Sequence, residues 1–175
     1  MNTPNTTTFR LTVYSTEFLW QGELALAAHR RLSDFVNDVD QQFLELARVK
    51  TACWENNAYR ILASPETAIV FKHNIVLVVV SEDALSAAAA DRAADRVSKV
   101  PQRVRIQAPP LVVEGNLHTP SMVDWSRAIN VTRSEFVPLT GASVWHSKSH
   151  VLLGTDIKLA LVHRSAIHSV QNVKT

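Results

Sequence analysis

The sequence repeats itself, and this repeat limits the possible folds more than any other feature of the chain. When the segment starting at Phe9 is laid over the segment starting at Gln102, an offset of 93 positions, the apolar residues stay in phase. Gly22 then falls on Gly115. Two unrelated β segments would share the alternation of apolar residues but not the glycine. The sequence therefore predicts an internal duplication.

A single length change interrupts this match. After it the offset is 91, which places Trp54 on Trp145 and aligns residues 70–76 with residues 161–167. Because one length change is enough to align the rest of both copies, the second half of the alignment also favours duplication.

Each copy has the period-2 apolar alternation of β-strands, bounded by turn residues. The expected strands cover 9–14, 18–26, 68–72 and 75–80 in the first copy and 103–107, 111–117, 158–163 and 166–171 in the second, with one more strand starting at Phe43 or Phe136. A short helical segment is expected at 32–37 and at 124–130. The last two strands of each copy are only two or three residues apart, which predicts a tight hairpin.

Short antiparallel strands must bury one face, and closing them into a small barrel also removes exposed edges. A glycine inside the second strand weakens that strand unless it permits a sharp bend or bulge, as SH3-like and Sm-like small barrels require. The sequence thus predicts a mainly β chain with two tandem SH3-like/Sm-like β-barrels, residues 9–80 and 101–173.

The segment 81–100 between the two copies is rich in alanine, the best helix former. Ser81 is suited to the N-cap, and Pro101 ends the helical pattern. The sequence predicts a linker α-helix, which either lies against a barrel or serves as a free spacer.

Composition limits the function only loosely. The formal net charge of +2 permits nucleic-acid binding without arguing for it. Cys53 is the only cysteine, so no intrachain disulfide can form, and a reducing compartment is favoured. The first eight residues lack the features of a signal peptide, and the longest apolar run, 75–80, is too short to span a bilayer. We expect a soluble cytoplasmic protein that does not enter membranes.

Basic or titratable residues occupy the turn between the last two expected strands of both copies. These candidate contacts with a partner or with nucleic acid are Lys72, His73, His163 and Arg164. An arginine in such a turn can grip a phosphate group with its forked guanidinium. The alternative is that these residues are polar because turns are exposed to solvent.

Residues 75–80 are apolar at every position, whereas the matching segment 166–171 alternates. A strand that is apolar on both faces needs burial on both. The candidate interface residues are Ile75, Val76, Val78 and Val80. We expect the linker helix, the second barrel or another subunit to cover them.

Other recurring residues have structural explanations. Asn37 and Asn130 fit helix ends, and Trp54 and Trp145 fit core packing, with base stacking as the alternative.

No catalytic or cofactor-binding residue is predicted. His146 and His150 are four positions apart in an expected hairpin, and the sequence shows no third ligand nearby, so no metal site is expected. The sequence shows neither a nucleophile elbow nor a phosphate-binding glycine loop. An enzyme is therefore the last of the functions we expect.

The residues at 22–24, 32–37 and 43–46 resemble a bacterial family of small β-domains of unknown function, which has a similar glycine strand, an LSD-hydrophobic-hydrophobic-N segment and an F-L-x-L strand. The second copy diverges at 124–130, where the aspartate is lost. The resemblance covers most of each copy and implies no activity.

The closing segments also resemble the last hairpin of Sm-like proteins. That resemblance implies RNA contacts at the basic turn and pairing of the final strands between subunits. This sequence departs from the Sm-like pattern because it lacks the glycine that usually follows the arginine.

The sequence as a whole predicts a non-enzymatic interaction or scaffold module that binds a protein partner or self-assembles into a homo-oligomer. The alternative function is binding of RNA or another single-stranded nucleic acid through the basic turns.

Overall fold

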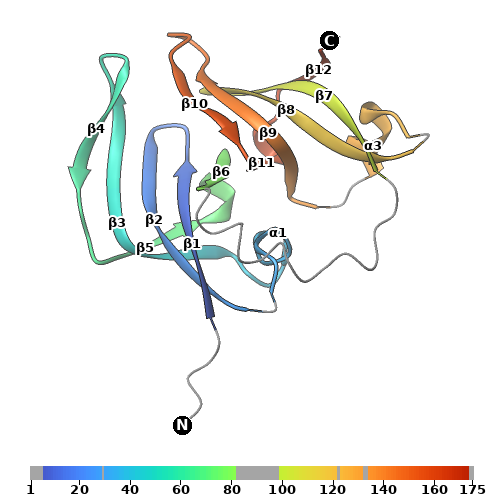
Figure 1. Cartoon of the computed structure of the whole chain (residues 1–175). Coiled ribbons are helices and arrows are strands. Elements are labelled where there is room, and N and C mark those ends of the chain that lie inside the picture. Colours follow the sequence, from blue (N-terminus) through green and yellow to red (C-terminus); the bar gives the residue numbers. More distant parts are fainter. Residues whose placement is uncertain (1–5, 29, 82–98, 122, 132–133, 174–175) are drawn as a thin grey trace. The chain divides into compact units, whose positions relative to one another are not determined.

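The computed structural model describes residues 6–28, 30–81, 99–121, 123–131 and 134–173. The chain divides into two compact units, unit 1 (Met1–Ala90) and unit 2 (Asp91–Thr175), and each is described by itself. Both are mainly β, as the sequence predicts, and their strands pair antiparallel (Figure 1).

Unit 1 begins with two long strands, and a short helix separates them from the rest. Its described elements are β1 (Thr6–Tyr14), β2 (Phe18–Ala27), α1 (Leu32–Val36), β3 (Phe43–Glu55), β4 (Ala58–Ala63), β5 (Thr67–Phe71), the 3-10 helix η1 (Lys72–Asn74) and β6 (Leu77–Val80). Strand β1 pairs with β2 and β6, and β3 pairs with β2, β4 and β5.

Unit 2 has the same order of elements. These are β7 (Lys99–Ala108), β8 (Leu111–Pro120), α3 (Trp125–Val131), β9 (Phe136–His146), β10 (Leu152–Ile157), β11 (Leu159–His163), the 3-10 helix η3 (Arg164–Ala166) and β12 (Ser169–Asn172). Strand β7 pairs with β8 and β12, and β9 pairs with β8, β10 and β11.

The tight closing hairpin predicted from the sequence is wrong. In unit 1 the two closing strands pair with different partners, β5 with β3 and β6 with β1. The reason lies in the turn between them, where the Ile75 N–H donates to the Lys72 carbonyl at 2.9 Å and closes a 3-10 helix instead of a hairpin turn. In unit 2 the N–H of Ile167 donates to the carbonyl of Arg164 in the same way.

Both units bend their third strand opposite the recurring glycine. The register of β2 with β3 shifts around Gly22, and the register of β8 with β9 shifts around Gly115. At each shift the third strand has one extra residue with positive φ, Arg48 (52°) in β3 and Gly141 (55°) in β9. A Cβ at Gly22 would lie 3.1 Å from the Ala47 carbonyl oxygen, so the two strands approach too closely for a side chain.

The pairing registers define which residues correspond, and we call two residues equivalent when they hold the same place in the registers of the two units. Leu19 pairs with Ala52, and Val112, 93 positions after Leu19, pairs with Trp145. Trp145 is therefore equivalent to Ala52. The predicted match of Trp145 with Trp54 is wrong, because the offset stays at 93 to the end of β9.

The offset after this strand also differs from the predicted value of 91. Phe43 pairs with Phe71 in unit 1, and Phe136 pairs with His163 in unit 2. Phe71 and His163 are equivalent and lie 92 positions apart. The basic residue that follows them is Lys72 in unit 1 and Arg164 in unit 2, so these two are also equivalent.

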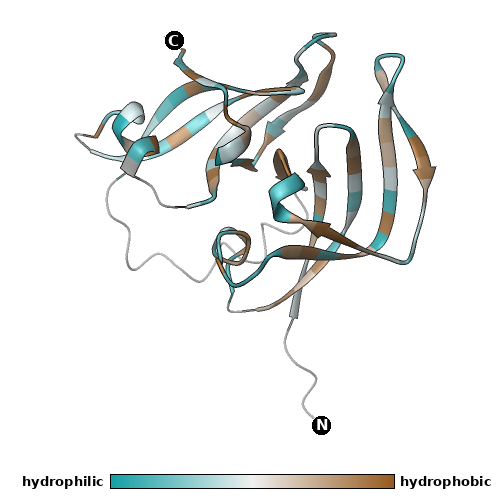
Figure 2. Ribbon diagram, turned by 180° about the vertical axis from the view of Figure 1, so that it is seen from behind, coloured by the Kyte–Doolittle hydropathy of each residue, from teal (hydrophilic) through white to brown (hydrophobic). Residues whose placement is uncertain are grey.

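Inward-facing apolar side chains of each unit form its core, as the alternation of hydrophobic and hydrophilic residues along the strands requires (Figure 2). The fully or almost fully buried residues include Leu11, Val13, Leu24, Leu44, Leu46 and Val49 in unit 1 and Val104, Ile106, Val113, Leu139, Ala142 and Val144 in unit 2.

The predicted linker helix falls mostly on residues 82–98, which lie outside the described residues. Its predicted end is wrong, because β7 already begins at Lys99, which pairs with Pro120 of β8.

Candidate functional site

The two equivalent basic residues of the turns hold their own unit together. Lys72 is only 4% exposed, and its Nζ donates to the Asp38 carbonyl oxygen at 2.7 Å. Nε of Arg164 donates to the Ser134 carbonyl oxygen at 3.2 Å. Each cation therefore ties the 3-10 helix to the loop that follows the short α-helix of its unit.

The two histidines of the turns differ in exposure. His163 is 8% exposed, its ring lies edge-on to Phe136 with 4.6 Å between centroids, and its Nδ1 is 2.6 Å from the Ser165 hydroxyl. His73 is exposed beside Phe71. Of the four turn residues, Lys72 and His163 are thus buried, Arg164 is half-buried and His73 is exposed.

The predicted interface strand is buried as well. Ile75, Val76, Val78 and Val80 are all almost fully inaccessible to solvent. A strand that is apolar on both faces needs such burial. Whether these residues take part in an interface stays a prediction.

Equivalent strands of the two units differ in burial. In β5 the side chains of Ile69 and Phe71 are 58% and 48% exposed. Their equivalents in β11, Leu161 and His163, are buried. The last strands show the reverse, since β6 is mostly buried while β12 is half-buried to exposed.

Strands β5 and β12 are also sheet edges, as are β4 and β10. Among the described residues, β5 pairs only with β3 and β12 only with β7. We call these two strands the free edges. An exposed strand edge offers unpaired backbone donors and acceptors to another chain.

Sequence reasoning missed the β5 edge, although a signal was present. Residues 68–71 are apolar at every position, like the longer run 75–80, with alanine, isoleucine, valine and phenylalanine in succession. The same argument from apolarity on both faces would have marked this strand as a candidate interface.

Unit 2 contains a second candidate, a hollow of about 600 Å³ on one face of β7, β8 and β9. We call it the Trp145 hollow. It is lined by Arg105, Gln107, Pro109, Leu111, Val112, Trp145, His146, Ser147 and His150. Its volume is within the range of small-molecule sites, and its walls combine apolar surface with several polar groups.

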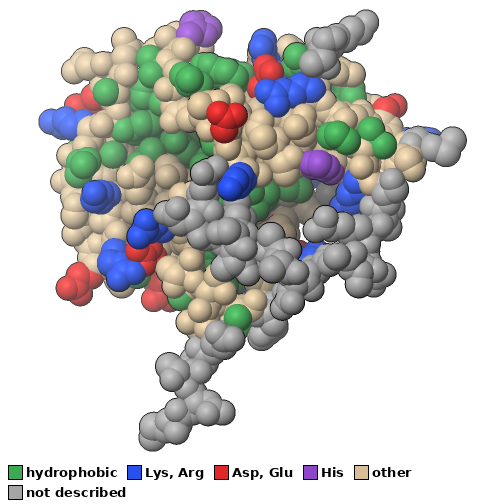
Figure 3. All heavy atoms as spheres, viewed as in Figure 1, with side chains coloured by type: hydrophobic (Ala, Val, Ile, Leu, Met, Phe, Trp, Pro, Cys, Tyr) green, Lys and Arg blue, Asp and Glu red, His purple; other side chains and the backbone are tan. Residues whose placement is uncertain are grey.

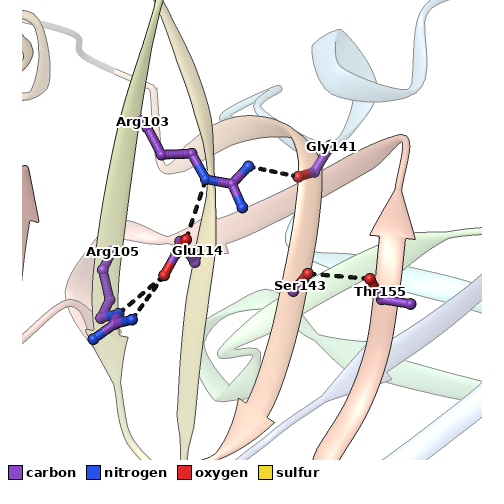
Figure 4. A network of polar contacts seen from close by, with 6 residues as sticks. All are labelled: Arg103, Arg105, Glu114, Gly141, Ser143 and Thr155. Carbon is purple, nitrogen blue, oxygen red and sulfur yellow. Dashed lines mark hydrogen bonds and ion pairs between the residues drawn. The ribbon is translucent and has the colours of Figure 1, made fainter. Parts of the chain in front are cut away.

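Two arginines beside this hollow share one carboxylate. Nε of Arg103 donates to Glu114 Oε1 at 3.2 Å, and Nη2 of Arg105 donates to Glu114 Oε2 at 2.9 Å (Figure 4). Arg103 also donates to the Gly141 carbonyl at the bulge. Burial raises the pKa of Glu114, but the hydrogen bonds and charges of Arg105 and Arg103 outweigh it, so the pKa lies below its usual value.

Glu114→Gln is expected to remove a pH dependence of stability. Because folding lowers the pKa of Glu114, its contribution is present above the ordinary glutamate pKa and is lost as the pH falls through the folded value. We expect the variant to be less stable than wild type by about 1–3 kcal/mol at pH 7, and this difference should shrink between about pH 5 and pH 3. Urea denaturation at each pH measures it.

Glu55→Gln is the matched control, because Glu55 forms an exposed ion pair with Arg60. A difference between Glu114→Gln and wild type that stays constant with pH would contradict the role of the carboxylate charge.

The two histidines of the hairpin lie at the end of β9 (His146) and in the loop that follows it (His150). His146 Nδ1 is 2.9 Å from the Ser149 hydroxyl, and burial together with the Lys148 charge lowers the pKa of His146. Within the described ranges, no group of three or more His, Cys, Asp or Glu side chains could hold a metal ion.

Asn37 ends α1 as expected, since it is the C-cap residue and its Nδ2 donates to the Ser33 carbonyl at 2.9 Å. Asn130, by contrast, lies inside α3. Trp54 packs against Tyr59, with 4.9 Å between ring centroids.

Comparison of this chain with protein-family models, with curated proteins and with solved structures finds no match. In the part of the chain that the structure describes, no helix has both the length and the apolar character that crossing a bilayer would need.

Proposed function

We propose that the chain is a non-enzymatic interaction module that arose by internal duplication of one small β-barrel and assembles head to tail with copies of itself. In this proposal the free edge of β5 in one copy receives β12 of another. The shared order of elements and the shared bulge opposite Gly22 and Gly115 support duplication.

The pairings within each unit support a small barrel. In unit 1 the consecutive strands β5 and β6 pair with β3 and β1, which lie on either side of β2. A single 3-10 helix between β5 and β6 joins the two ends of this series. The pairings of unit 1 therefore run from β6 through β1, β2 and β3 to β5, and the chain itself connects β5 to β6 through η1.

The observation behind the assembly proposal is the opposite burial of equivalent strands. Unit 1 exposes β5, whose equivalent β11 is buried in unit 2, and unit 2 exposes β12, whose equivalent β6 is buried in unit 1. The equivalent of each free edge in the other unit thus has buried side chains. Two different and complementary surfaces on one chain produce a head-to-tail interface, which closes into a ring or continues as a filament.

Burial of the exposed apolar side chains supplies a driving force. Removing Ile69 and Phe71 from water stabilises an interface by about 1.5–3 kcal/mol for each side chain that becomes fully buried. Backbone hydrogen bonds along the strand edges would add to this and would fix the register.

The alternative, nucleic-acid binding through the basic turns, is less well supported. The burial of Lys72 and His163 leaves His73 and the half-buried Arg164 to carry such contacts. A cytoplasmic location, which a single cysteine favours, stays part of the proposal.

Ile69→Lys is expected to abolish the assembly, because it places a charge on the exposed face of β5. Size-exclusion chromatography with light scattering should give a mass of several chains for wild type and 19.4 kDa for the variant. Ile61→Lys, on β4, is the control and should assemble like wild type, since Ile61 is exposed outside the free edges. A wild-type mass of one chain at all concentrations, or an assembled Ile69→Lys chain, would refute the proposal.

A further inference from the structure

The place of the Trp145 hollow is occupied differently in unit 1. The equivalent of Gln107 there is Tyr14, 93 positions earlier. Ser147 directly follows β9, and the residue 93 positions before it, which we take as its equivalent, is Trp54. Both rings contact Tyr59, with centroid distances of 5.9 Å to Tyr14 and 4.9 Å to Trp54. Burial raises the pKa of Tyr14 to about 12, which agrees with a packed ring.

Unit 1 therefore fills this position with its own aromatic rings. Figure 3 shows hydrophobic side chains gathered over β1–β4 of this unit. Unit 2 has shorter or polar residues at the equivalents of Tyr14 and Trp54, and a hollow is present there. The position that edge-to-face aromatic rings fill in unit 1 is thus open in unit 2 to a ring from outside.

The wall of the hollow suits a planar ring. Trp145 is half-buried and pairs with Val112 across the strands, so its indole stands beside an aliphatic surface. Pro109 and Leu111 complete the apolar part of the lining. Aromatic rings stack on such an indole face with a gain beyond simple area burial.

The polar part of the lining suits a negative charge. Arg103 and Arg105 share the single carboxylate of Glu114, which leaves a local excess of positive charge (Figure 4). Arg105 uses its Nε and Nη2 on that carboxylate. A guanidinium has five N–H donors, so the interaction with Glu114 does not exhaust the donors of Arg105.

We propose that the Trp145 hollow binds a small planar aromatic anion, whose ring stacks on Trp145 and whose negative group accepts hydrogen bonds from Arg105. Gln107 lines the same space and stands between β12 and this site, with its Oε1 2.9 Å from the Ser169 hydroxyl. Nucleoside monophosphates and aromatic carboxylates share the required chemistry. This inference does not rest on the self-assembly of the chain.

The test is an NMR titration of the four tryptophan indole N–H signals of the wild-type chain, with the Trp145 signal assigned from Trp145→Phe. One arm uses adenosine monophosphate and the other indole-3-acetate. The controls are adenosine, which has the ring but no negative charge, and acetate, which has the charge but no ring. We expect saturable shifts of the Trp145 signal in one arm or both, and the arm with the tighter Kd identifies the source. Neither control should reach saturation.

Two variants and one control sharpen the test. Arg105→Gln should weaken the Kd about tenfold or more by removing the charge-assisted hydrogen bonds. Gln107→Tyr, which installs the residue of unit 1, should fill the hollow and abolish the shifts while the chain stays folded. Arg60→Gln removes an exposed, ion-paired arginine from unit 1 and should leave the Kd unchanged.

Three results would overturn the inference. These are the absence of a saturable Trp145 shift in both arms, equal binding of the uncharged or ring-free control, and equal weakening by Arg60→Gln and Arg105→Gln.

Discussion

Leu139→Ala is expected to lower the free energy of unfolding by about 2–5 kcal/mol. Leu139 is fully buried, and its Cβ lies 3.2 Å from the position that a Cβ at Gly115 would take. The side chain therefore fills the core where Gly115 allows β8 and β9 to approach closely. Its removal leaves a cavity that the bulged strand cannot collapse onto without losing its register.

Urea denaturation followed by tryptophan fluorescence measures this loss. Leu152→Ala is the control, because Leu152 is 52% exposed on β10 of the same unit, and we expect a change of no more than about 0.5 kcal/mol. Equal effects of the two substitutions would show that the contacts of Leu139 do not hold unit 2 together.

Lys72→Glu is expected to destabilise the chain by about 3–5 kcal/mol. The substitution replaces a buried ammonium that donates to the Asp38 carbonyl with a carboxylate that can only accept, so two acceptors would face each other away from water. We expect the variant to have a lower melting temperature than wild type or to accumulate as insoluble protein.

His73→Glu is the matched control, because His73 is the next residue of the same turn and is exposed. It makes the same change to an acidic side chain, and we expect little effect on the melting temperature. If Lys72→Glu melted at the wild-type temperature, the ammonium would have no structural role, and the turn would again be a candidate for anion binding.

The sequence predicted the strands well where the pattern is local. Period-2 alternation located the long strands. The glycine inside the second strand predicted a bulge or bend of that strand, and the structure has a bulge at this place, with the extra residue on the third strand opposite Gly22 and Gly115. The start of the third strand at Phe43 and Phe136 was also correct. In each case the preference depends on the residue and its immediate neighbours.

The sequence could not show which strands pair with which. Strands β5 and β6 are close along the chain and look like a hairpin, yet they pair with β3 and β1. Strand pairing depends on distant partners, so alternation alone does not fix it. The wrong match of Trp54 with Trp145 has the same cause, since two tryptophans can be aligned in sequence without holding the same place in the strand registers.

Burial of polar residues was equally hard to predict. Lys72 looked like an exposed turn residue, but its long aliphatic stem is buried and lets the terminal amine reach the Asp38 carbonyl. The Trp145 hollow is present where unit 2 lacks the two aromatic rings that unit 1 has at Tyr14 and Trp54. This difference becomes visible only when the registers of the two units are compared.

The most direct test of head-to-tail assembly mixes two chains that each lack one of the free edges. Ile69→Lys disables β5. Asn172→Pro disables β12, because alternate residues of a strand point their N–H groups to opposite sides, and the N–H of the next residue, Val173, donates to Arg103 of β7. Each variant retains one intact edge, complementary to that of the other.

Sedimentation velocity of the two variants, alone and in equimolar mixture, is the decisive measurement. The proposal predicts that each variant alone sediments as a single chain and that the mixture forms a complex of one chain of each kind and nothing larger. A mixture that stays as single chains, or a variant that still assembles alone, would contradict assembly through β5 and β12.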